Sequence, residues 1–322
     1  MKTRRALITG ISGQDGAYLA QYLLTRDYTV IGAINPKRKS ELTGLKTLGI
    51  FSKIEQAKID VTNADEVHRF FRDNKVDDVY HLAAQSSVAA SFYNPAKTLQ
   101  YNIISVINLL ESIRTLSQSV HFYNASSSEM YGNVSSLPIT LSTPFNPLSS
   151  YAVSKVAAHQ IVKSYRESYG LFACNGILFN HESPRRGSNF VTNKVVKRAV
   201  EISLGKADKL VLGNLDSKRD WGHSKDYMKA IIKMMDYKEA RNWIIATGKS
   251  HSVRDLCTYV FEKLNLDPEK YVTQNPKFMR PEELKYLCGD SSETRKTLKW
   301  EPEYTFETML DEMIEKWQNH LS

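Results

Sequence analysis

The sequence has few cysteines and no long apolar run. Its 322 residues include three cysteines, Cys174, Cys257 and Cys288, whose odd number and wide spacing match no disulfide framework or metal-ligand pattern. We therefore expect reduced, partly buried thiols in a cytoplasmic protein. We also expect neither a membrane span nor a signal peptide, because the apolar residues 6–8 are followed at once by Thr9 and Gly10.

Signatures of nucleic-acid binding, internal repeats and low-complexity segments are also absent. The chain carries 43 Lys and Arg against 35 Asp and Glu, a net charge of +8, and only residues 37–39 form a tight basic run. A positive balance suits anionic small molecules as well as polynucleotides, and no zinc-finger or RNP motif is present. We expect an anionic small-molecule partner, with no nucleic acid and no membrane.

Segments typical of strands and helices alternate through the first half of the chain. We expect strands at 5–9, 28–34, 79–84, 120–125 and 172–178, a third strand ending at 59–62, and helices at 17–24, 64–74 and 96–115. This order predicts an α/β fold, with a Rossmann-type doubly wound parallel sheet. We expect residues 1–178 to form this dinucleotide-binding domain, completed by a strand near 242–247. Residues 179–322 should mainly form a smaller, substrate-binding domain.

The first expected strand is followed by a glycine-rich turn, residues 10–16, and then by a helix. This is the context of a dinucleotide-binding fingerprint, in which glycines let the backbone approach a pyrophosphate at the helix N-terminus. An ordinary strand-to-helix turn is the alternative. The second strand ends at residues 35–39, where Lys37 and Arg38 replace the acid that usually holds a ribose 2′-hydroxyl. These cations favour NADP, with NAD and a solvated basic loop as alternatives.

Tyr151 and Lys155 lie four residues apart, so on a helix they share one face. A phenol with a pKa near 10 needs roughly 4 kcal/mol of help to act as a base near neutrality. A neighbouring ammonium and an oxidised nicotinamide would both favour the phenolate, which could then take a proton from a sugar hydroxyl. The alternative is a tyrosine and a lysine at this spacing by chance.

Ser127 and Glu129 are two residues apart, so on an extended segment they would point to the same side. The serine could hold the sugar hydroxyl that Tyr151 deprotonates. Once carbon 4 of the sugar is a ketone, the proton on carbon 5 is acidic, and Glu129 could remove it and help water leave from carbon 6. The alternative is that Glu129 is a helix-start or surface residue.

Longer segments then give the sequence a family resemblance. They are residues 6–16, 82–86, 128–132, Tyr151-x-x-x-Lys155, 174–187, 212–223, and Arg280-Pro281-x-Glu283 with Gly289-Asp290. With these segments the chain resembles, almost end to end, the GDP-mannose 4,6-dehydratase family of the extended short-chain dehydrogenase/reductase superfamily. The glycine and Tyr/Lys motifs are shared across the superfamily, whereas the two long segments are specific to this family.

The resemblance implies three sets of site residues. The catalytic set would be Ser127, Glu129, Tyr151 and Lys155. The cofactor contacts would be Gly10, Gly13, Gln14, Asp15, Gly16, Lys37, Arg38, Asp60, Leu82, Ala84, Tyr151, Lys155, His181 and Arg186. The contacts to the nucleotide sugar would be Ser87, Asn180, Lys194, Gly213, Arg219, Arg280 and Glu283. No metal is implied. Guanidinium groups suit a diphosphate, although Arg219 could instead pair with Asp216.

Four departures from the family pattern bear on the substrate and the cofactor. Ser127 replaces the family's threonine, Ser87 a histidine, Asn193 an arginine, and residues 35–36 the paired arginines after the second strand. The resemblance implies GDP-mannose as substrate, with GDP-N-acetylglucosamine or GDP-heptose as variants. Arg185 and Arg186 resemble a loop that crosses to a neighbouring subunit, which implies a homodimer or homotetramer. A reductase or epimerase, or a non-catalytic cofactor-sensing protein, is the alternative function.

Overall fold

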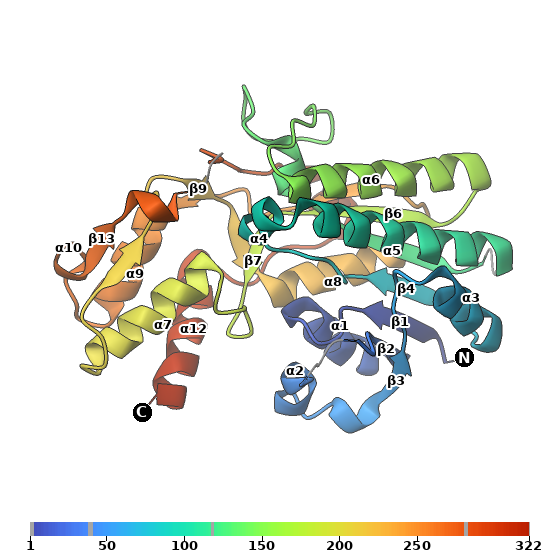
Figure 1. The fold of residues 1–322 in the computed structure, drawn as a ribbon, viewed down its shortest axis with the longest axis horizontal. Helices are drawn as coiled ribbons and strands as arrows, with labels where there is room; N and C mark the ends of the chain where they lie inside the picture. The colour runs from blue at the N-terminus through green and yellow to red at the C-terminus, as the bar shows by residue number, and fades with distance from the viewer. Residues whose placement is uncertain (1–2, 38–40, 117–118, 280–282, 322) are drawn as a thin grey trace.

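A seven-stranded parallel sheet forms the centre of the larger part of the molecule (Figure 1). The computed structural model describes residues 3–37, 41–116, 119–279 and 283–321. Its strands run in the order β11-β6-β5-β4-β1-β2-β3. They are β1 Arg5–Thr9, β2 Thr29–Ile34, β3 Ile54–Lys58, β4 Asp78–His81, β5 His121–Ser127, β6 Ala173–Leu178 and β11 Asn242–Ile245. The strands nearest the middle, β5, β4 and β1, are largely buried, as parallel strands between two helix layers must be.

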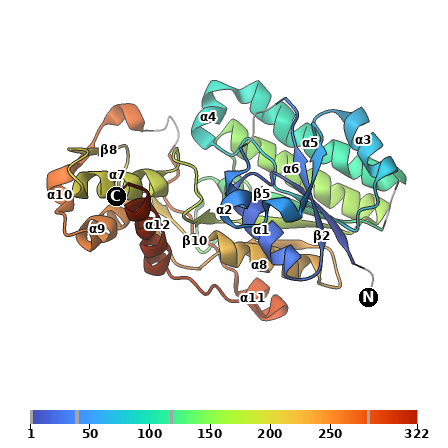
Figure 2. The ribbon, with the colours of Figure 1, turned by 90° about the horizontal axis from the view of Figure 1, so that it is seen from below.

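Helices cover both faces of this sheet (Figure 2). One layer contains α1 Gln14–Leu24 and α8 Ser224–Met235, and the other contains α3 Ala64–Asp73, α5 Pro95–Leu116 and α6 Ser150–Tyr169. The apolar residues of the two layers form two separate clusters, one on each side of the strands. The predicted α/β doubly wound fold is therefore confirmed, and the strand expected near 242–247 joins the sheet as β11 beside β6.

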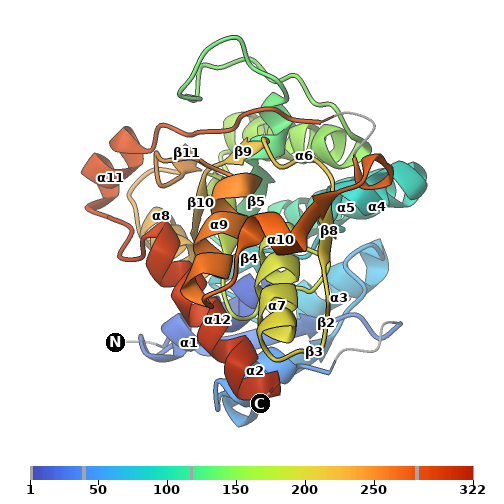
Figure 3. The same cartoon turned by 90° about the vertical axis from the view of Figure 1, so that its left-hand side faces the viewer.

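A second group of elements, here called the outer lobe, packs beyond the carboxyl ends of the strands (Figure 3). It consists of α7 Val191–Ser203, β8 Leu210–Leu212, α9 Val253–Lys263, α10 Pro268–Tyr271, β13 Val272–Gln274 and α12 Phe306–Leu321. These elements enclose an apolar cluster of their own, which includes Val196, Phe261 and Met313. Two short strand pairs, β7 Asn180–Glu182 with β10 Trp221–His223 and β9 Lys218–Arg219 with β12 His251–Ser252, lie between the outer lobe and the sheet.

The third and fourth strands end earlier than expected from the sequence. The third strand ends at Lys58, before the expected 59–62, because the Asp60 side chain accepts hydrogen bonds from the backbone and hydroxyl of Thr62 and so forms a turn. The fourth strand ends at His81 rather than at residue 84. Residues 82–84 leave the sheet there and run along the mouth of a pocket.

The remaining sequence expectations concern the cysteines and the membrane. All three cysteines are free and buried, and burial raises the pKa of Cys174 to about 11, so none is poised to react. Among the described helices, none combines the length and apolarity needed to cross a bilayer.

Candidate active site

A cavity of about 930 Å³ opens between the carboxyl ends of the strands and the outer lobe. Its floor comes from the ends of β1, β4 and β5, and its far wall from α7 and β8. Parallel α/β sheets place their ligand sites at this edge, because the loops after successive strands meet there.

The glycine-rich turn between β1 and α1 forms one side of this cavity. Gly10 has φ +76°, and a Cβ on Gly16 would lie 2.4 Å from the Gly10 carbonyl oxygen, so a side chain at either position would strain or displace the turn. Gly13 begins α1 and offers no side-chain cap, which leaves the first backbone amides of the helix available to an anion. This cradle fits the pyrophosphate of a dinucleotide.

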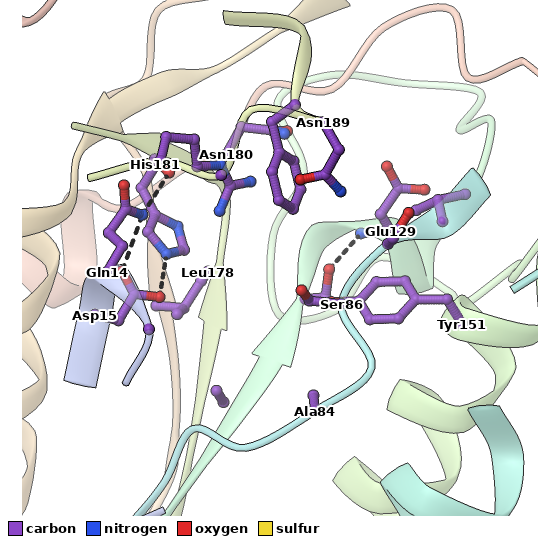
Figure 4. A pocket seen from close by; sticks show the side chains of 18 of the residues that line it. Gln14, Asp15, Ala84, Ser86, Glu129, Tyr151, Leu178, Asn180, His181 and Asn189 are labelled. Carbon is purple, nitrogen blue, oxygen red and sulfur yellow. Dashed lines mark hydrogen bonds and ion pairs between the residues drawn. The ribbon is translucent and has the colours of Figure 1, made fainter. Parts of the chain in front are cut away.

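Next to the glycines, α1 is tied to β7 and α8 by polar side chains (Figure 4). The Asp15 carboxylate accepts from His181 Nε2 at 2.9 Å and from the Ser224 hydroxyl at 2.6 Å. Gln14 Nε2 donates to the His181 carbonyl at 3.1 Å, and the Ser183 hydroxyl donates to Gln14 Oε1 at 2.7 Å. These contacts join residues more than 160 positions apart and hold β7 and α8 against the glycine turn.

Asp15 and His181 form a half-buried ion pair. His181 Nδ1 faces the Phe179 carbonyl at 2.8 Å, so both ring nitrogens face acceptors and the ring is a cation. Burial alone would lower the pKa of His181, but the Asp15 carboxylate outweighs it and raises that pKa. Burial would likewise raise the pKa of Asp15, yet the histidine holds it below its usual range.

On the opposite side of the cavity, strand β5 ends at Ser127 and a 3₁₀ turn, Ser128–Tyr131, begins. The expectation that Ser127 and Glu129 share an extended segment is wrong. They are brought together because the Ser127 hydroxyl caps the turn, accepting from the Glu129 backbone amide at 3.3 Å. Glu129 is thus a helix-start residue, yet its carboxylate also points into the cavity (Figure 4). Among the described residues, that carboxylate has no hydrogen-bond or ion-pair partner.

Helix α6 supplies Tyr151 and Lys155 from one face, as predicted. The Ser149 hydroxyl caps its first turn, accepting from the Ala152 amide at 3.1 Å. This cap fixes where the helix begins and so places Tyr151 in its first turn. Lys155 Nζ donates to the Ala125 carbonyl at 2.7 Å and lies 5.8 Å from the centre of the Tyr151 ring. The phenol is also a hydrogen-bond partner of Ser127.

Burial dominates the electrostatics of these two residues. It raises the pKa of Tyr151 to about 12, which the Ser127 hydrogen bond opposes and the Glu129 charge reinforces. In the protein alone, burial therefore outweighs any lowering by Lys155, and the effect of Lys155 together with an oxidised nicotinamide stays a prediction. Burial lowers the pKa of Lys155 to about 8, so this ammonium is itself only partly retained above neutral pH. A further positive charge in the cavity is needed before Tyr151 becomes a useful base.

Most of the expected cofactor contacts line the same cavity. Leu82, Ala84 and Arg186 do so, together with the glycines, Gln14, Asp15 and His181. Lys37 and Asp60 lie beside it and pair at 3.0 Å, where the lysine side chain is 71% exposed. Arg38 lies outside the described residues. The guanidinium of Arg186 folds back within its own chain, 2.9 Å from Glu182 and over the Phe190 ring.

The residues expected to hold the nucleotide sugar line the outer wall: Ser87, Asn180, Lys194, Gly213, Arg219 and Glu283. Arg280 lies outside the described residues. The suggested Arg219–Asp216 pair is wrong, because Asp216 pairs with Arg254 at 2.8 Å. Buried Arg219 instead donates to the Leu284 carbonyl at 2.9 Å and lies 3.8 Å from Glu283. Ser87 caps α4 Val88–Tyr93, accepting from the Ala90 amide.

Sequence reasoning missed two residues of this wall. Asn189 lies at the mouth of the cavity (Figure 4), and Phe278, 56% exposed, lies 4.9 Å from the Lys194 ammonium. Neither belongs to a motif with a stated mechanism. The only available signal was the position of Phe278, two residues before Arg280, because neighbours of a ligand-binding arginine often share its site.

Two comparisons with known sequences agree. Residues 7–313 match the protein family described as GDP-mannose 4,6 dehydratase. GDP-mannose 4,6-dehydratase from Vibrio cholerae serotype O1 is 40% identical over 351 residues, covering 98% of this chain and 93% of that protein. GDP-mannose 4,6 dehydratase from Homo sapiens is 40% identical over 337 residues, covering 96% and 90%.

Solved structures show a similar arrangement. RMD from Pseudomonas aeruginosa, complexed with NADPH, superposes with a TM-score of 0.83 at 25% identity, covering 99% of this chain and 100% of that one. UDP-glucose 4-epimerase from Thermotoga maritima, with UDP-glucose, gives a TM-score of 0.88 at 23% identity, again covering 99% and 100%. The second likeness is one of fold.

Proposed function

This chain belongs to the GDP-mannose 4,6-dehydratase family, and on that basis we propose that it is a lyase that converts GDP-mannose to its 4-keto-6-deoxy derivative. The reaction oxidises carbon 4, eliminates water across carbons 5 and 6, and reduces carbon 6, so no net oxidation occurs. We include GDP-N-acetylglucosamine and GDP-heptose as variant substrates, because Ser87, where the family has histidine, lines the cavity.

The glycine cradle and the amides at the start of α1 hold the pyrophosphate of a nicotinamide dinucleotide, which would take a hydride from carbon 4 and return it to carbon 6. We favour NADP. Lys37 neutralises Asp60, a carboxylate that would otherwise repel a 2′-phosphate beside the second and third strands. The likeness to RMD complexed with NADPH supports the same choice.

Tyr151 takes the proton of the 4-hydroxyl, and Ser127 holds that hydroxyl from the side. Because burial alone raises the pKa of Tyr151 to about 12, the base is weak until a cationic ring is bound nearby. Lys155 supplies a nearby positive charge and keeps it aimed by donating to the Ala125 carbonyl. The protein thus makes oxidation depend on an oxidised cofactor being in place.

Glu129 takes the proton from carbon 5, which the new ketone has made acidic, and delivers a proton to the departing 6-hydroxyl. Two protons are removed from the sugar, one by Tyr151 and one by Glu129. Two are returned, one to the leaving water and one to carbon 5, so the reaction is balanced. This role requires a carboxylate in the cavity that no cation of the described residues engages, which is the observation that carries the proposal.

On the outer wall, Arg219 and Lys194 face the phosphates and base of the GDP group. Glu283, held by the Ser217 hydroxyl at 3.2 Å, accepts from ribose hydroxyls.

We also propose that the protein is a homodimer or homotetramer. Light scattering coupled to gel filtration would test this; a monomer at all concentrations would contradict it.

A three-substrate assay tests the proposed function. The purified protein is incubated with NADP and GDP-mannose, GDP-N-acetylglucosamine or GDP-heptose, and the products are weighed by mass spectrometry. We expect at least one nucleotide sugar to lose one water. A product that keeps its 6-hydroxyl, or net consumption of reduced cofactor, would favour an epimerase or a reductase. The absence of any product would favour a cofactor-sensing protein.

A further inference from the structure

A chain of buried polar side chains lies directly behind Tyr151 and Lys155, and the reaction as described makes no use of it. It contains Ser126 on β5, His159 on α6, Asn175 on β6 and Asn242 on β11. Ser126, His159 and Asn175 are at most 3% exposed. His159 follows Tyr151 and Lys155 along α6 at the same spacing of four residues, so all three side chains leave one face of the helix.

The hydrogen bonds of this chain run in one direction. Arg166 can only donate, and both of its terminal nitrogens lie 3.3 Å from Asn242 Oδ1. The oxygen of that amide therefore faces Arg166, and its nitrogen faces His159 Nε2 at 3.1 Å. Asn175 supports the assignment, because its own Nδ2 donates to the same Asn242 oxygen at 3.2 Å. His159 Nε2 must accept, so it carries no proton.

The other ring nitrogen must then carry the proton of a neutral imidazole. His159 Nδ1 donates to the Ser126 oxygen at 2.9 Å, and the Ser126 hydroxyl donates onward to Asn175 Oδ1 at 3.3 Å. Burial lowers the pKa of His159 to about 4, and the charges of Arg166 and Lys163 act in the same direction. Every member of the chain is paired, so the tautomer and the orientation of the ring are both fixed.

Ser126 lies on β5 between Ala125 and Ser127, the two residues that contact Lys155 and Tyr151. The Ala125 carbonyl accepts from Lys155 Nζ at 2.7 Å, and Ser127 is the hydrogen-bond partner of Tyr151. Three successive residues of β5 are therefore held by three side chains of α6, one helical turn apart. Apolar packing is nondirectional and would tolerate a small slide of the helix along the strand, whereas these polar contacts would not.

We propose that His159 is a positioning residue for the dehydration reaction, holding Ser126 so that Lys155 stays on the Ala125 carbonyl and Tyr151 stays on Ser127. The inference rests on the proposed function, because it assigns these contacts to that chemistry. The proposed role explains why a histidine, rather than an apolar residue, occupies this buried position.

Two substitutions at His159 separate positioning from packing. His159→Phe keeps the ring volume and the edge contact to Phe145, whose ring centre lies 5.3 Å away, but it makes neither hydrogen bond. His159→Gln can accept from Asn242 and donate to Ser126 through its amide. We expect kcat of the Phe variant to fall about tenfold or more, because reacting groups shift from their productive geometry. KM and cofactor affinity should stay within about twofold of wild type, and the Gln variant should recover kcat to within about threefold.

Two results would overturn the inference. One is a folded His159→Phe variant with wild-type kcat. The other is a variant whose kcat, cofactor affinity and melting temperature all fall while its KM rises, since that pattern belongs to a structural role. A wild-type protein that forms no product from any GDP-sugar would instead refute the proposed function. The two failures are therefore distinguishable.

The direction of the hydrogen bonds can be measured without turnover. Nitrogen NMR of ¹⁵N-histidine-labelled protein should show His159 neutral, with its proton on Nδ1. Asn242→Asp replaces the amide donor with an acceptor and should move a proton onto Nε2. A wild-type His159 protonated on Nε2, or a spectrum unchanged by Asn242→Asp, would contradict the proposed chain.

Discussion

The charged groups on the two sides of the cavity differ in whether they have a partner of opposite charge. On the glycine side, Asp15 and His181 neutralise each other, and Gln14 and Ser224 complete their hydrogen bonds. On the β5 side, Glu129 has no partner among the described residues, and burial pushes the pKa values of Tyr151 and Lys155 towards the neutral forms. The first arrangement stabilises the protein, whereas the second leaves groups ready to exchange protons with a ligand.

The largest effect should come from the β5 side. Lys155→Met should lower kcat by about 10³-fold, because the proton transfer at Tyr151 loses the charge beside it. Its stability at pH 7 should be unchanged or higher, since a buried ammonium is costly. The wild type holds fewer protons folded than unfolded between about pH 8 and 10.4, so its stability relative to the variant should rise with pH across that range. Assays of kcat and thermal melts over this pH range would check both expectations. A Lys155→Met variant that loses stability as well as activity would contradict the difference between the two sides.

Glu129→Gln should have the next largest effect, with turnover reduced by about 10²-fold. The amide is nearly the same shape but cannot take the carbon 5 proton, so the reaction should stop after oxidation of carbon 4. Stopped-flow absorbance should then show reduced nicotinamide accumulating in one turnover. Glu129→Gln with full turnover would remove Glu129 from the proton transfer.

On the glycine side, Asp15→Asn should lower the free energy of unfolding by about 1–3 kcal/mol. The substitution leaves the half-buried His181 without its carboxylate partner. Asp15 contributes above its unfolded pKa near 3.9 and loses its effect as pH falls, since its folded pKa is lowered. His181 contributes fully below about pH 6.5 and loses its effect as pH rises through its raised folded pKa. The difference in melting temperature should therefore be largest between about pH 4 and 6.5 and smaller at pH 9. A difference that does not vary with pH would mean that the pair is not charged.

Lys37→Ala should have the smallest effect. The lysine is mostly exposed and screened by solvent, so the ratio of NADP to NAD affinity should fall by roughly fivefold or less. Fluorescence titration with both reduced cofactors measures this ratio. An unchanged ratio would place the discrimination elsewhere.

The sequence predicts the fold and the helix positions of the site better than its ion pairs and pKa values. Alternating apolar strands and helices define the Rossmann-type fold, and the spacing of Tyr151 and Lys155 places them on one helix face. The Asp15–His181 pair could not be predicted, because its partners are 166 residues apart and meet only through tertiary packing. The net rise in the pKa of Tyr151 in the protein alone could not be predicted, because spacing indicates neighbours but not burial.

Local turn chemistry explains the other differences. The position of Glu129 depends on Ser127 capping a 3₁₀ turn, and the end of β3 depends on the turn formed by Asp60. Serine and aspartate can cap, turn or face solvent, and sequence alone does not decide between these roles. The direction of the His159 hydrogen bonds depends in turn on which atom of Asn242 faces Arg166.

The central claim is that Glu129 turns an oxidoreductase site into a dehydratase site. It is tested most directly by running the wild-type reaction with GDP-mannose in D₂O and locating deuterium in the product by NMR. If Glu129 acts as this base, the 4-keto-6-deoxy product carries one solvent deuterium at carbon 5, because a carboxylate that exchanges with solvent removes that proton and solvent-derived deuterium replaces it. A product that retains the original hydrogen at carbon 5 together with its 6-hydroxyl would contradict it.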